Sequence, residues 1–561
     1  MDAQDPQAPP APGWSRPPAP QPRAGSSPKA PPRPPARRPR HTPAPAARRP
    51  ESTGAGMGAW SLYFLAKAGL YHAGSIGFGW IGNLLFAAAL AWPLRWPWAR
   101  RARRWLAWPV ALGLFYHDSF LPGPERLLAG LGGFSAEYLW ELAARAVNPW
   151  VALALVAGVV AYGLLARWVP FTVVAFLGIL SVPAVAELGA EPAAASAVQS
   201  AAAPADPQAR LQTFYQDESR RKLHLPAGGT PAFDLVVLHV CSLAWDDLDV
   251  VGERNHPLFG RFDLLFSDFN SAASYSGPAV LRLLYGACGQ VRHGQLYRGA
   301  PRECQIFPVL EQAGFKTGAL LNHDGEFDDF SKLLEYRGGL RGKVQVSRGA
   351  PVHMRSFDGS PIYDDLAVLS AWWRQRQGQG GQPAALYYNT VSLHDGNRVS
   401  GSDTRGSLAS YKPRLHKLLN DFDRFIGQLE SSGRPVVLVM VPEHGASLRG
   451  DKMQFAGMRE IPGPRVTLVP AAVKLIGLPG RQGGGPLVVD RPTSYFDLNS
   501  LLADLVADSP YGARARPLSA RLGRVGTTPF VSENEDVVVV RDAAGGYRMK
   551  AGQGAWASYA F

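Results

Sequence analysis

Five apolar runs, joined by short polar or arginine-rich segments, fill residues 57–189 and constrain the fold more than any other feature of the chain. A helix that crosses a bilayer needs about 20 apolar residues, with a range of about 17 to 25. The first run is shorter than this and contains Lys67, whereas the others reach the range. In chain order the runs are 60–74, 76–94, 105–121, 149–165 and 168–185. The pattern predicts an N-terminal α-helical membrane domain over residues 57–189.

Arginines set the expected topology of this domain. The joint between the second and third runs contains Arg95, Arg100, Arg101, Arg103 and Arg104. Because positive loops stay in the cytoplasm, we expect this joint and the basic N-terminal tail on the same side of the membrane. The chain then crosses twice between them, which gives five membrane helices and places everything after residue 188 on the far side. The alternative is four helices, with 60–74 lying on the membrane surface.

The segment 122–148, between the third and fourth runs, is expected outside the cytoplasm. Its spacing of polar and apolar residues predicts an amphipathic helix. The charged residues of the segment are Glu125, Arg126, Glu137, Glu141 and Arg145.

The net charge of +13 lies mostly outside the globular part. Residues 1–50 hold nine Lys/Arg against two Asp/Glu, together with 17 of the 49 prolines. Such a segment cannot bury enough apolar surface to offset chain entropy, so a disordered, cytoplasmic Pro/Arg-rich tail is expected over 1–56. Residues 201–561 hold forty Lys/Arg against thirty-six Asp/Glu. A net charge of only +4 there argues against a nucleic-acid-binding face.

Residues 231–561 have an ordinary globular composition and follow an Ala/Pro/Gln-rich segment, 190–230, that is expected to be a linker. Short Val/Leu-rich runs alternate with helical stretches, which is typical of a parallel sheet covered by helices. The predicted strands are 234–240, 315–321, 384–391 and 435–441. The predicted helices are 278–287, 364–376 and 408–431. The sequence therefore predicts an α/β domain.

Candidate metal ligands follow the predicted strands, at the edge where parallel sheets bind ligands. Thiolate, imidazole and carboxylate groups, the usual ligands of zinc, gather there. They are Cys241 after the first strand, His323 and Asp324 after the second, His394 and Asp395 after the third, and Glu443 and His444 after the fourth.

Most of these residues also have a structural interpretation. A cysteine that ends a buried strand is more often a core residue than a ligand. His394 can cap a turn, and His323 is the weakest candidate. Glu443 indicates function most strongly, because burying a carboxylate at a sheet edge is costly without a cation.

The small-residue loop 270–278 runs into a predicted helix that has Pro278 near its first position. The free N–H groups and positive dipole of such a helix start suit a phosphate. Ser276 stands at this start, and a serine near a metal can act as a nucleophile. The alternative is that one of the loop serines simply caps the helix.

Five separated motifs together resemble the bacterial cellulose phosphoethanolamine transferases of the BcsG family. The resemblance runs in one order over about residues 57–550. The motifs are 239–245 (HVCSLAW), 269–278 (FNSAASYSGP), 357–361 (FDGSP), 393–397 (LHDGN) and 443–445 (EHG). The family is similar in fold to alkaline phosphatases, sulfatases and the phosphoethanolamine transferases that modify lipid A. The resemblance thus implies an alkaline phosphatase-like catalytic domain in the periplasm and a multi-pass anchor in the inner membrane.

The resemblance also implies roles for particular residues. A zinc ion would be held by Cys241, Ser276, Glu443 and His444, with Ser276 as the nucleophile. His394 would donate or accept a proton, Arg459 would clamp the phosphate, and Tyr275 would line the pocket.

The family's remaining cysteine pair matches Cys288 and Cys304, which implies a disulfide. Closure of a loop of this size is worth about 3 kcal/mol in the chain-entropy model. The third cysteine, Cys241, would then serve as a zinc ligand.

The implied reaction is zinc-dependent transfer of phosphoethanolamine from phosphatidylethanolamine to the glucosyl 6-hydroxyl of nascent cellulose, through a phosphoethanolamine-serine intermediate. The implied partners are the lipid donor, the cellulose acceptor, the membrane bilayer and the cellulose synthase subunits. The alternatives are a related transferase or sulfatase acting on lipid A, a glycerol-phosphate polymer or another glycan, and an inactive scaffold of the synthase. Relatives that act on lipid A usually present an acidic ligand and a Thr nucleophile in place of Cys241 and Ser276, which favours the cellulose branch. The long Pro/Arg-rich tail departs from the family pattern.

Overall fold

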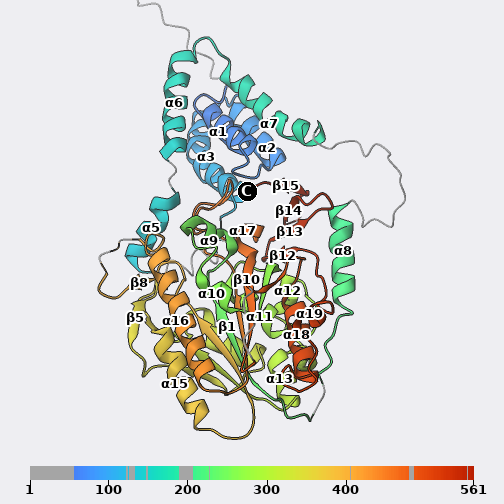
Figure 1. The fold of residues 1–561 in the computed structure, drawn as a ribbon. Helices are drawn as coiled ribbons and strands as arrows, with labels where there is room; N and C mark the ends of the chain where they lie inside the picture. Colours follow the sequence, from blue (N-terminus) through green and yellow to red (C-terminus); the bar gives the residue numbers. More distant parts are fainter. Residues whose placement is uncertain are drawn as a thin grey trace, which may run out of the picture. The chain divides into compact units, whose positions relative to one another are not determined.

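The computed structural model describes residues 56–121, 124, 133–146, 149–188, 206–225, 228–402, 404, 406–478, 485–552 and 554–561 (Figure 1). The predicted disordered tail, up to residue 55, lies outside the described residues. So do most of the predicted linker and two charged residues of the 122–148 segment, Glu125 and Arg126.

Five helices of the N-terminal part correspond to the five apolar runs. They are α1 (Trp60–His72), α2 (Trp80–Ala91), α3 (Pro97–Asp118), α6 (Pro149–Leu165) and α7 (Phe171–Leu188). The predicted amphipathic helix is also present, as α5 (Ala136–Ala146). A small apolar core, which includes Phe64, Ala87, Ala111 and Ile179, joins α1, α2, α3 and α7.

The arginine-rich joint differs from the prediction. The sequence suggested a loop from Arg95 to Arg104, but α3 begins at Pro97 and contains the last four of these arginines. Proline is favoured at the first position of a helix, because its ring fixes φ and the missing N–H has no intrahelical partner there. The helix therefore starts eight residues before the predicted apolar run.

Among the described residues, no single helix combines the length and hydropathy expected of a membrane span. The pair Ala136–Arg145 and Pro149–Leu165 meets the criteria jointly, with a bend of 59° between its two helices. The stretches Trp80–Ala91 and Phe171–Ala184 are apolar but shorter.

Lys67, the charged residue of the first apolar run, is buried in a polar cluster. Its Nζ donates to Asp118 Oδ2 at 2.7 Å, to Asn83 Oδ1 at 2.9 Å and to the carbonyl oxygen of Leu114 at 3.1 Å. Buried charges of this kind are tolerated when they are paired and hydrogen-bonded. The lysine thus links α1 to α2 and to the C-terminal end of α3.

The α/β domain is built on an eight-stranded sheet with the order β11-β2-β10-β9-β1-β7-β3-β4. The central strand β1 pairs in parallel with both β7 and β9, whereas β10 runs antiparallel to β9 and β2. The strands are β1 (Asp234–Val240), β2 (Leu264–Asn270), β3 (Lys316–Leu321), β4 (Val344–Val346), β7 (Ala384–Thr390), β9 (Val436–Pro442), β10 (Leu468–Ile476) and β11 (Leu487–Val489). The four predicted strands are therefore confirmed to within one residue at each end.

Helices cover both faces of this sheet, as Figure 1 shows. Alternate side chains of a strand point to opposite faces. Leu235 and Val237 of β1 accordingly join the core under α11 (Ser276–Leu284), α13 (Ile306–Gln312) and α18 (Tyr495–Ala507). Val236 and Leu238 join the core under α15 (Asp365–Gln377) and α16 (Tyr411–Ser431).

Two smaller sheets and several short helices complete the domain. The C-terminal sheet contains β12 (Val531–Glu533), β13 (Val537–Arg541), β14 (Tyr547–Ala551) and β15 (Ala557–Tyr559). The other contains β5 (Val352–Arg355), β6 (Pro361–Tyr363) and β8 (Arg398–Val399). The short helices are α9 (Trp245–Val251), α10 (Pro257–Arg261), α12 (His293–Leu296), α14 (Phe330–Lys332), α17 (Pro464–Thr467), α19 (Leu518–Leu522), η1 (Arg302–Cys304), η2 (Phe327–Asp329) and η3 (Leu333–Arg337).

The described part of the segment 190–230, from residue 206 onwards, contains a helix that the sequence did not predict. The helix is α8 (Pro207–Glu218), which Asp206 caps by accepting hydrogen bonds from two backbone N–H groups. Leu211 and Phe214 of this helix pack against Val531 and Val540 of the C-terminal sheet. The Asp-Pro start and the two apolar residues three positions apart are the local signals of this helix.

Candidate active site

The register of the sheet brings Cys241 next to Glu443. Val240, the last residue of β1, is paired with Pro442, the last residue of β9. Cys241 follows the first of these strands and Glu443 follows the second. The backbone N–H of Glu443 donates to the carbonyl oxygen of Val240 at 2.8 Å. Both side chains are fully buried.

Ser276, the first residue of α11, completes a compact cluster with these residues and His444. The Ser276 Oγ lies 3.4 Å from Cys241 Sγ and 3.3 Å from His444 Nε2. The distance from His444 Nε2 to Glu443 Oε2 is 3.8 Å. Ligand atoms of Cys241, Glu443 and His444 lie within 4.8 Å of one another. The structure thus brings together the four residues that the family resemblance implies as zinc ligands.

The donor set of this cluster fits a zinc ion. Glu443 Oε2 is buried and, among the described residues, has no hydrogen-bond partner. His444 Nδ1–H donates to the carbonyl oxygen of Gly445 at 2.9 Å, which leaves the Nε2 lone pair directed at the cluster. Burial raises the pKa of the Cys241 thiol to about 12, so its thiolate form is unfavourable without a nearby cation. A divalent cation would satisfy all three groups at once.

A chain of hydrogen bonds supports Glu443 from behind. Asn389, near the end of β7, donates from Nδ2 to Glu443 Oε1 at 2.6 Å and accepts at Oδ1 from His323 Nε2 at 3.0 Å. The other ring nitrogen of His323 accepts from the Gly325 N–H. His323 therefore supports the cluster through Asn389. The sequence interpretation missed Asn389, because a polar residue within an apolar strand carries no recognisable motif.

His239 was also missed as a site residue, although it interrupts the apolar run of β1. Its ring lies between the hydroxyl groups of Tyr387 and Tyr495, at 3.0 Å and 3.2 Å, and Nδ1 is 3.8 Å from Glu443 Oε1. Burial lowers the pKa of His239 to about 3. A neutral imidazole at this position leaves the negative charge of Glu443 available to a metal.

The loop before α11 positions Ser276. Tyr275 occupies the N-cap position and makes no side-chain capping bond, so none of the loop serines caps the helix. Ser274 instead donates its hydroxyl to the carbonyl oxygen of Arg459, and Asn534 donates to Ser274 Oγ at 2.6 Å. These bonds tie the loop of the candidate nucleophile to the segment of the candidate phosphate clamp.

Arg459 and Tyr275 lie beside the cluster. Arg459 Nη1 donates to Ser242 Oγ at 3.1 Å and lies 3.4 Å from His444 Nδ1. Its guanidinium carbon is 5.5 Å from the centroid of the Tyr275 ring, and the Tyr275 hydroxyl donates to Glu460 Oε1. A guanidinium in this position suits a phosphate oxygen.

His394 lies on the loop after β7 and, in the part of the chain that the structure describes, makes no direct hydrogen bond to the four-residue cluster. Its Nδ1–H donates to the carbonyl oxygen of Asp395 at 2.6 Å, which leaves Nε2 as a proton acceptor. Its ring packs on Phe357 with a centroid distance of 4.9 Å. Burial, reinforced by the charge of Arg459, lowers the pKa of His394 to about 4. The imidazole is therefore neutral at physiological pH.

The predicted disulfide is confirmed. Cys288 and Cys304 are bonded, and Cys241 is a free, buried cysteine. The bond joins the segment after α11 to η1.

The fold and the cluster define an α/β domain, joined to N-terminal helices, with a thiol, a hydroxyl, a carboxylate and an imidazole converging at the carboxyl edge of its sheet. The chain belongs to the family of cellulose biosynthesis protein BcsG. Its residues 60–184 match the N-terminal domain of that family, and residues 191–556 match the C-terminal domain.

Two relatives are similar over nearly their whole length. The BcsG protein of Salmonella typhimurium is 36% identical over 542 residues, which cover 90% of this chain and 96% of the relative. The BcsG protein of Escherichia coli K12 is 36% identical over 525 residues, which cover 87% and 93%.

Solved structures are more distant. The integral membrane protein lipooligosaccharide phosphoethanolamine transferase A from Neisseria meningitidis is 16% identical, with a TM-score of 0.39, and the match covers 68% of this chain and 79% of that one. A protein in the alkaline phosphatase superfamily from Vibrio parahaemolyticus is 14% identical, with a TM-score of 0.41 and coverage of 63% and 88%. Family membership therefore rests on the two domain matches and the two relatives.

Proposed function

We propose that this protein transfers phosphoethanolamine from phosphatidylethanolamine to the glucosyl 6-hydroxyl of nascent cellulose, with a zinc ion held by its catalytic domain. The single observation that carries the proposal is the position of Ser276, whose Oγ lies within 3.4 Å of both Cys241 Sγ and His444 Nε2. Family membership supplies the link to cellulose biosynthesis.

Cys241, Glu443 and His444 would hold the zinc ion, with Ser276 Oγ as the remaining ligand. When bound, zinc would lower the pKa of the Ser276 hydroxyl and neutralise charge on the phosphoryl group. The orphaned Glu443 Oε2 and the oriented His444 ring support this assignment.

Ser276 would act as the nucleophile in the first step. Its Oγ loses a proton and forms a bond to phosphorus, while the bond between phosphorus and the diacylglycerol oxygen breaks and that oxygen takes up a proton. Arg459 would bind a phosphate oxygen, because its guanidinium is held beside the cluster by Ser242. The product of this step is a phosphoethanolamine ester of Ser276.

A hydroxyl of the acceptor would attack this ester in the second step. The glucosyl oxygen would bond to phosphorus and give its proton to His394 Nε2, while the Ser276–phosphorus bond breaks. His394 would then release this proton to solvent and the serine oxygen would take one up from solvent, which regenerates both groups. The neutral state of His394 and its free Nε2 suit it for this role.

We further propose a multi-pass inner-membrane protein with five membrane helices, a periplasmic catalytic domain and a cytoplasmic N-terminal tail. A lipid donor and an acceptor that emerges from a membrane synthase would both be within reach of such a protein. The Cys288–Cys304 disulfide supports an oxidising compartment for the catalytic domain. Labelling of single cysteines, introduced into the tail and into the 101–104 segment, by a membrane-impermeant reagent would report the side on which each lies.

Mass spectrometry of the zinc-loaded full chain tests the enzymatic part. After incubation with dioleoyl phosphatidylethanolamine in detergent, we expect a phosphoethanolamine adduct on the peptide that contains Ser276, and no adduct in Ser276→Ala. Solid-state NMR of cellulose from cells that carry the protein tests the acceptor. An adduct without modified cellulose would point to lipid A or another glycan as acceptor, and absence of both zinc and adduct would point to an inactive scaffold of the synthase.

A further inference from the structure

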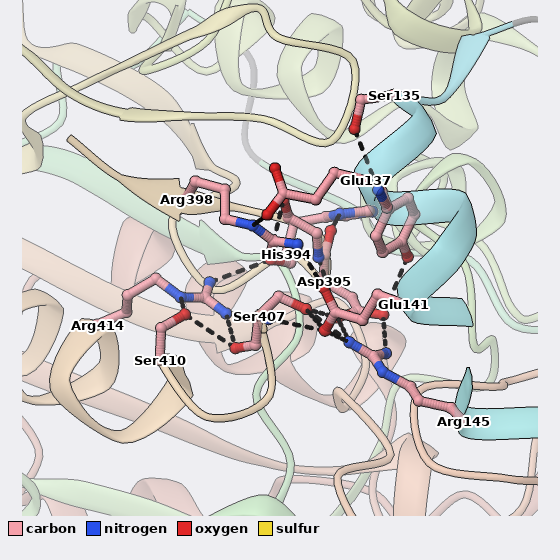
Figure 2. Close-up of polar contacts among 12 residues, drawn as sticks. Ser135, Glu137, Glu141, Arg145, His394, Asp395, Arg398, Ser407, Ser410 and Arg414 are labelled. Atoms are coloured by element: carbon pink, nitrogen blue, oxygen red, sulfur yellow. Dashed lines mark hydrogen bonds and ion pairs between the residues drawn. The ribbon is translucent and has the colours of Figure 1, made fainter. Parts of the chain in front are cut away.

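Helix α5, which precedes the α/β domain by almost 90 residues, packs one face against the loop that carries His394 (Figure 2). The face consists of Tyr138, Glu141 and Arg145, spaced three and four residues apart as neighbours on a helix surface must be. The helix is also anchored at its start, where the backbone N–H of Ser135 donates to the carbonyl oxygen of Phe357 at 3.0 Å.

The centre of this contact is a buried ion pair between Arg145 and Asp395. Arg145 donates from Nη1 to Asp395 Oδ2 at 2.7 Å and from Nη2 to Asp395 Oδ1 at 3.1 Å. The side chains of these residues are only 10% and 3% exposed. Tyr138 adds a third hydrogen bond, from its hydroxyl to Asp395 Oδ2 at 3.0 Å. A bidentate pair of this kind fixes geometry as well as charge.

Asp395 connects this ion pair directly to His394. The carbonyl oxygen of Asp395 accepts the hydrogen bond from His394 Nδ1 that sets the tautomer and orientation of the ring. Arg145 therefore holds the side chain of Asp395, and the backbone carbonyl of Asp395 orients His394, the candidate proton acceptor.

The α/β domain secures the same loop from the other side. Arg414 of α16 donates to the carbonyl oxygens of Ser392 at 2.7 Å, His394 at 3.1 Å and Ser407 at 3.0 Å. These bonds fix the backbone of the loop. The domain also donates to the Asp395 carboxylate, from the Ser407 hydroxyl and from the Gly396 N–H at 3.0 Å, but both of these donors are neutral. The charge of Asp395 is matched by Arg145, which comes from outside the domain.

Two glycines allow α5 to approach this closely. A Cβ on Gly396, which has a φ of +83°, would lie 2.5 Å from Phe357 Cβ and 3.0 Å from Tyr138 Cε2. A Cβ on Gly457 would lie 2.8 Å from Arg145 Nη1. The Arg459 guanidinium itself donates to Ser242 Oγ at 3.1 Å, so the ion pair acts on the loop of the candidate base and leaves the candidate clamp in place.

We propose that Arg145 is a positioning residue for the reaction: by holding Asp395 it orients His394, so that the second step of the transfer depends on α5 being docked. This inference rests on the proposed function for the role of His394. On this inference the N-terminal part of the chain contributes a positioning residue to the active site, in addition to attaching the protein to the membrane.

The test compares variants of the full chain, purified in detergent and loaded with zinc, using dioleoyl phosphatidylethanolamine as donor and cellopentaose as acceptor. Arg145→Met should form the Ser276 adduct at close to the wild-type rate but discharge it to cellopentaose about 100-fold more slowly, so that the adduct accumulates. Arg145→Lys, which retains the charge without the bidentate geometry, should discharge the adduct at a rate between those of the wild type and Arg145→Met. Asp395→Asn and the double variant Arg145→Met/Asp395→Asn should discharge the adduct as slowly as Arg145→Met, because all three variants lack the Arg145–Asp395 ion pair.

Arg261→Met is the matched control. Arg145 bonds the carboxylates of Asp395 and Glu141. Arg261 likewise bonds two carboxylates, those of Asp423 and Glu430, but it does so between α10 and α16. This variant should leave both steps unchanged.

Hydrogen exchange gives a readout that does not depend on the reaction. In Arg145→Met, the amides of residues 392–398 should exchange faster while those of β1 and β9 stay protected. Equal slowing of adduct formation and adduct discharge in a folded Arg145→Met protein would overturn the inference. So would a discharge rate equal to that of the wild type, or amide exchange rates of residues 392–398 equal to those of the wild type. If the wild-type protein forms no adduct at all, the proposed function fails instead, and the exchange data alone decide whether Arg145 orders the loop.

Discussion

The Nε2 atom of His444 lies 3.3 Å from the Oγ atom of Ser276, although 168 residues separate them in the chain. The Nδ1–H group of His444 is engaged by the carbonyl oxygen of Gly445. Nε2 therefore carries a lone pair, and without a metal the Ser276 hydroxyl can donate to it. A bound cation would replace that hydrogen bond and convert the hydroxyl into a metal-bound nucleophile.

Replacement of Ser276 by alanine should abolish the adduct and lower turnover at least about 1,000-fold, because no other hydroxyl takes its place at the helix start. Ser267→Ala is the control, since Ser267 lies on β2 and donates only to the carbonyl oxygen of Val489. Adduct mass and steady-state turnover are the measurements. An adduct that persists in Ser276→Ala would show that another residue is the nucleophile.

Replacement of Glu443 by glutamine should have opposite effects on the metal-free and the zinc-loaded protein. Without metal, the variant should be as stable as the wild type or more stable, because a buried carboxylate with an orphaned oxygen becomes a neutral amide. With zinc at about 1,000 times its Kd, the wild type should gain about 4 kcal/mol, and the variant much less.

Metal analysis and urea unfolding with and without a chelator check this expectation. Glu253→Gln, at a carboxylate that pairs with Lys412 and His416 on the surface, controls for loss of a negative charge. Equal zinc content and equal zinc-dependent stabilisation in wild type and Glu443→Gln would exclude Glu443 as a ligand.

The burial of His394 should make the stability of the catalytic domain fall at acidic pH. Its pKa is lowered to about 4 in the folded protein, from about 6.5 in an unfolded chain. Between these values the unfolded state binds a proton that the folded state does not, so stability is full above pH 6.5 and is lost as the pH falls towards 4. The loss is about 3 kcal/mol. Urea unfolding at pH 7.0, 5.5 and 4.5 should show a smaller decline in His394→Gln, and parallel declines would contradict the assignment.

The strands and their chemistry could be predicted because both follow from local patterns. A buried parallel strand is apolar throughout, so β1 and β9 are visible as Val/Leu runs. The sheet rule then places whatever follows those strands at one edge, which is why Cys241 and Glu443 were found together. The rule does not place β9 directly beside β1, so the contact between the two residues comes from the strand order of the structure.

The contacts that complete the site could not be predicted in this way. Arg145 and Asp395 are 250 residues apart, and neither stands in a motif that names the other. The sequence shows that α5 is amphipathic, but it does not show which surface its polar face meets. Asn389 was missed for a similar reason, since its amide can donate to Glu443 only when β7 lies beside β1 and near the loop after β9.

Removal of the disulfide should weaken the fold without changing the chemistry. Cys288, which is bonded to Cys304, lies in the segment after the last residue of α11, whereas Ser276 is the first residue of that helix. The free energy of unfolding of the double variant Cys288→Ala/Cys304→Ala should therefore be about 3 kcal/mol lower than that of the wild type, because its unfolded chain regains the conformational entropy that the disulfide removes. Zinc content and the rate of adduct formation should stay near wild-type values at temperatures where the variant is folded. Urea unfolding under non-reducing conditions measures the first effect, and wild-type protein in a reducing buffer should approach the variant. Loss of zinc or of the adduct in a folded double variant would show that the bond also holds the active-site end of α11 in place.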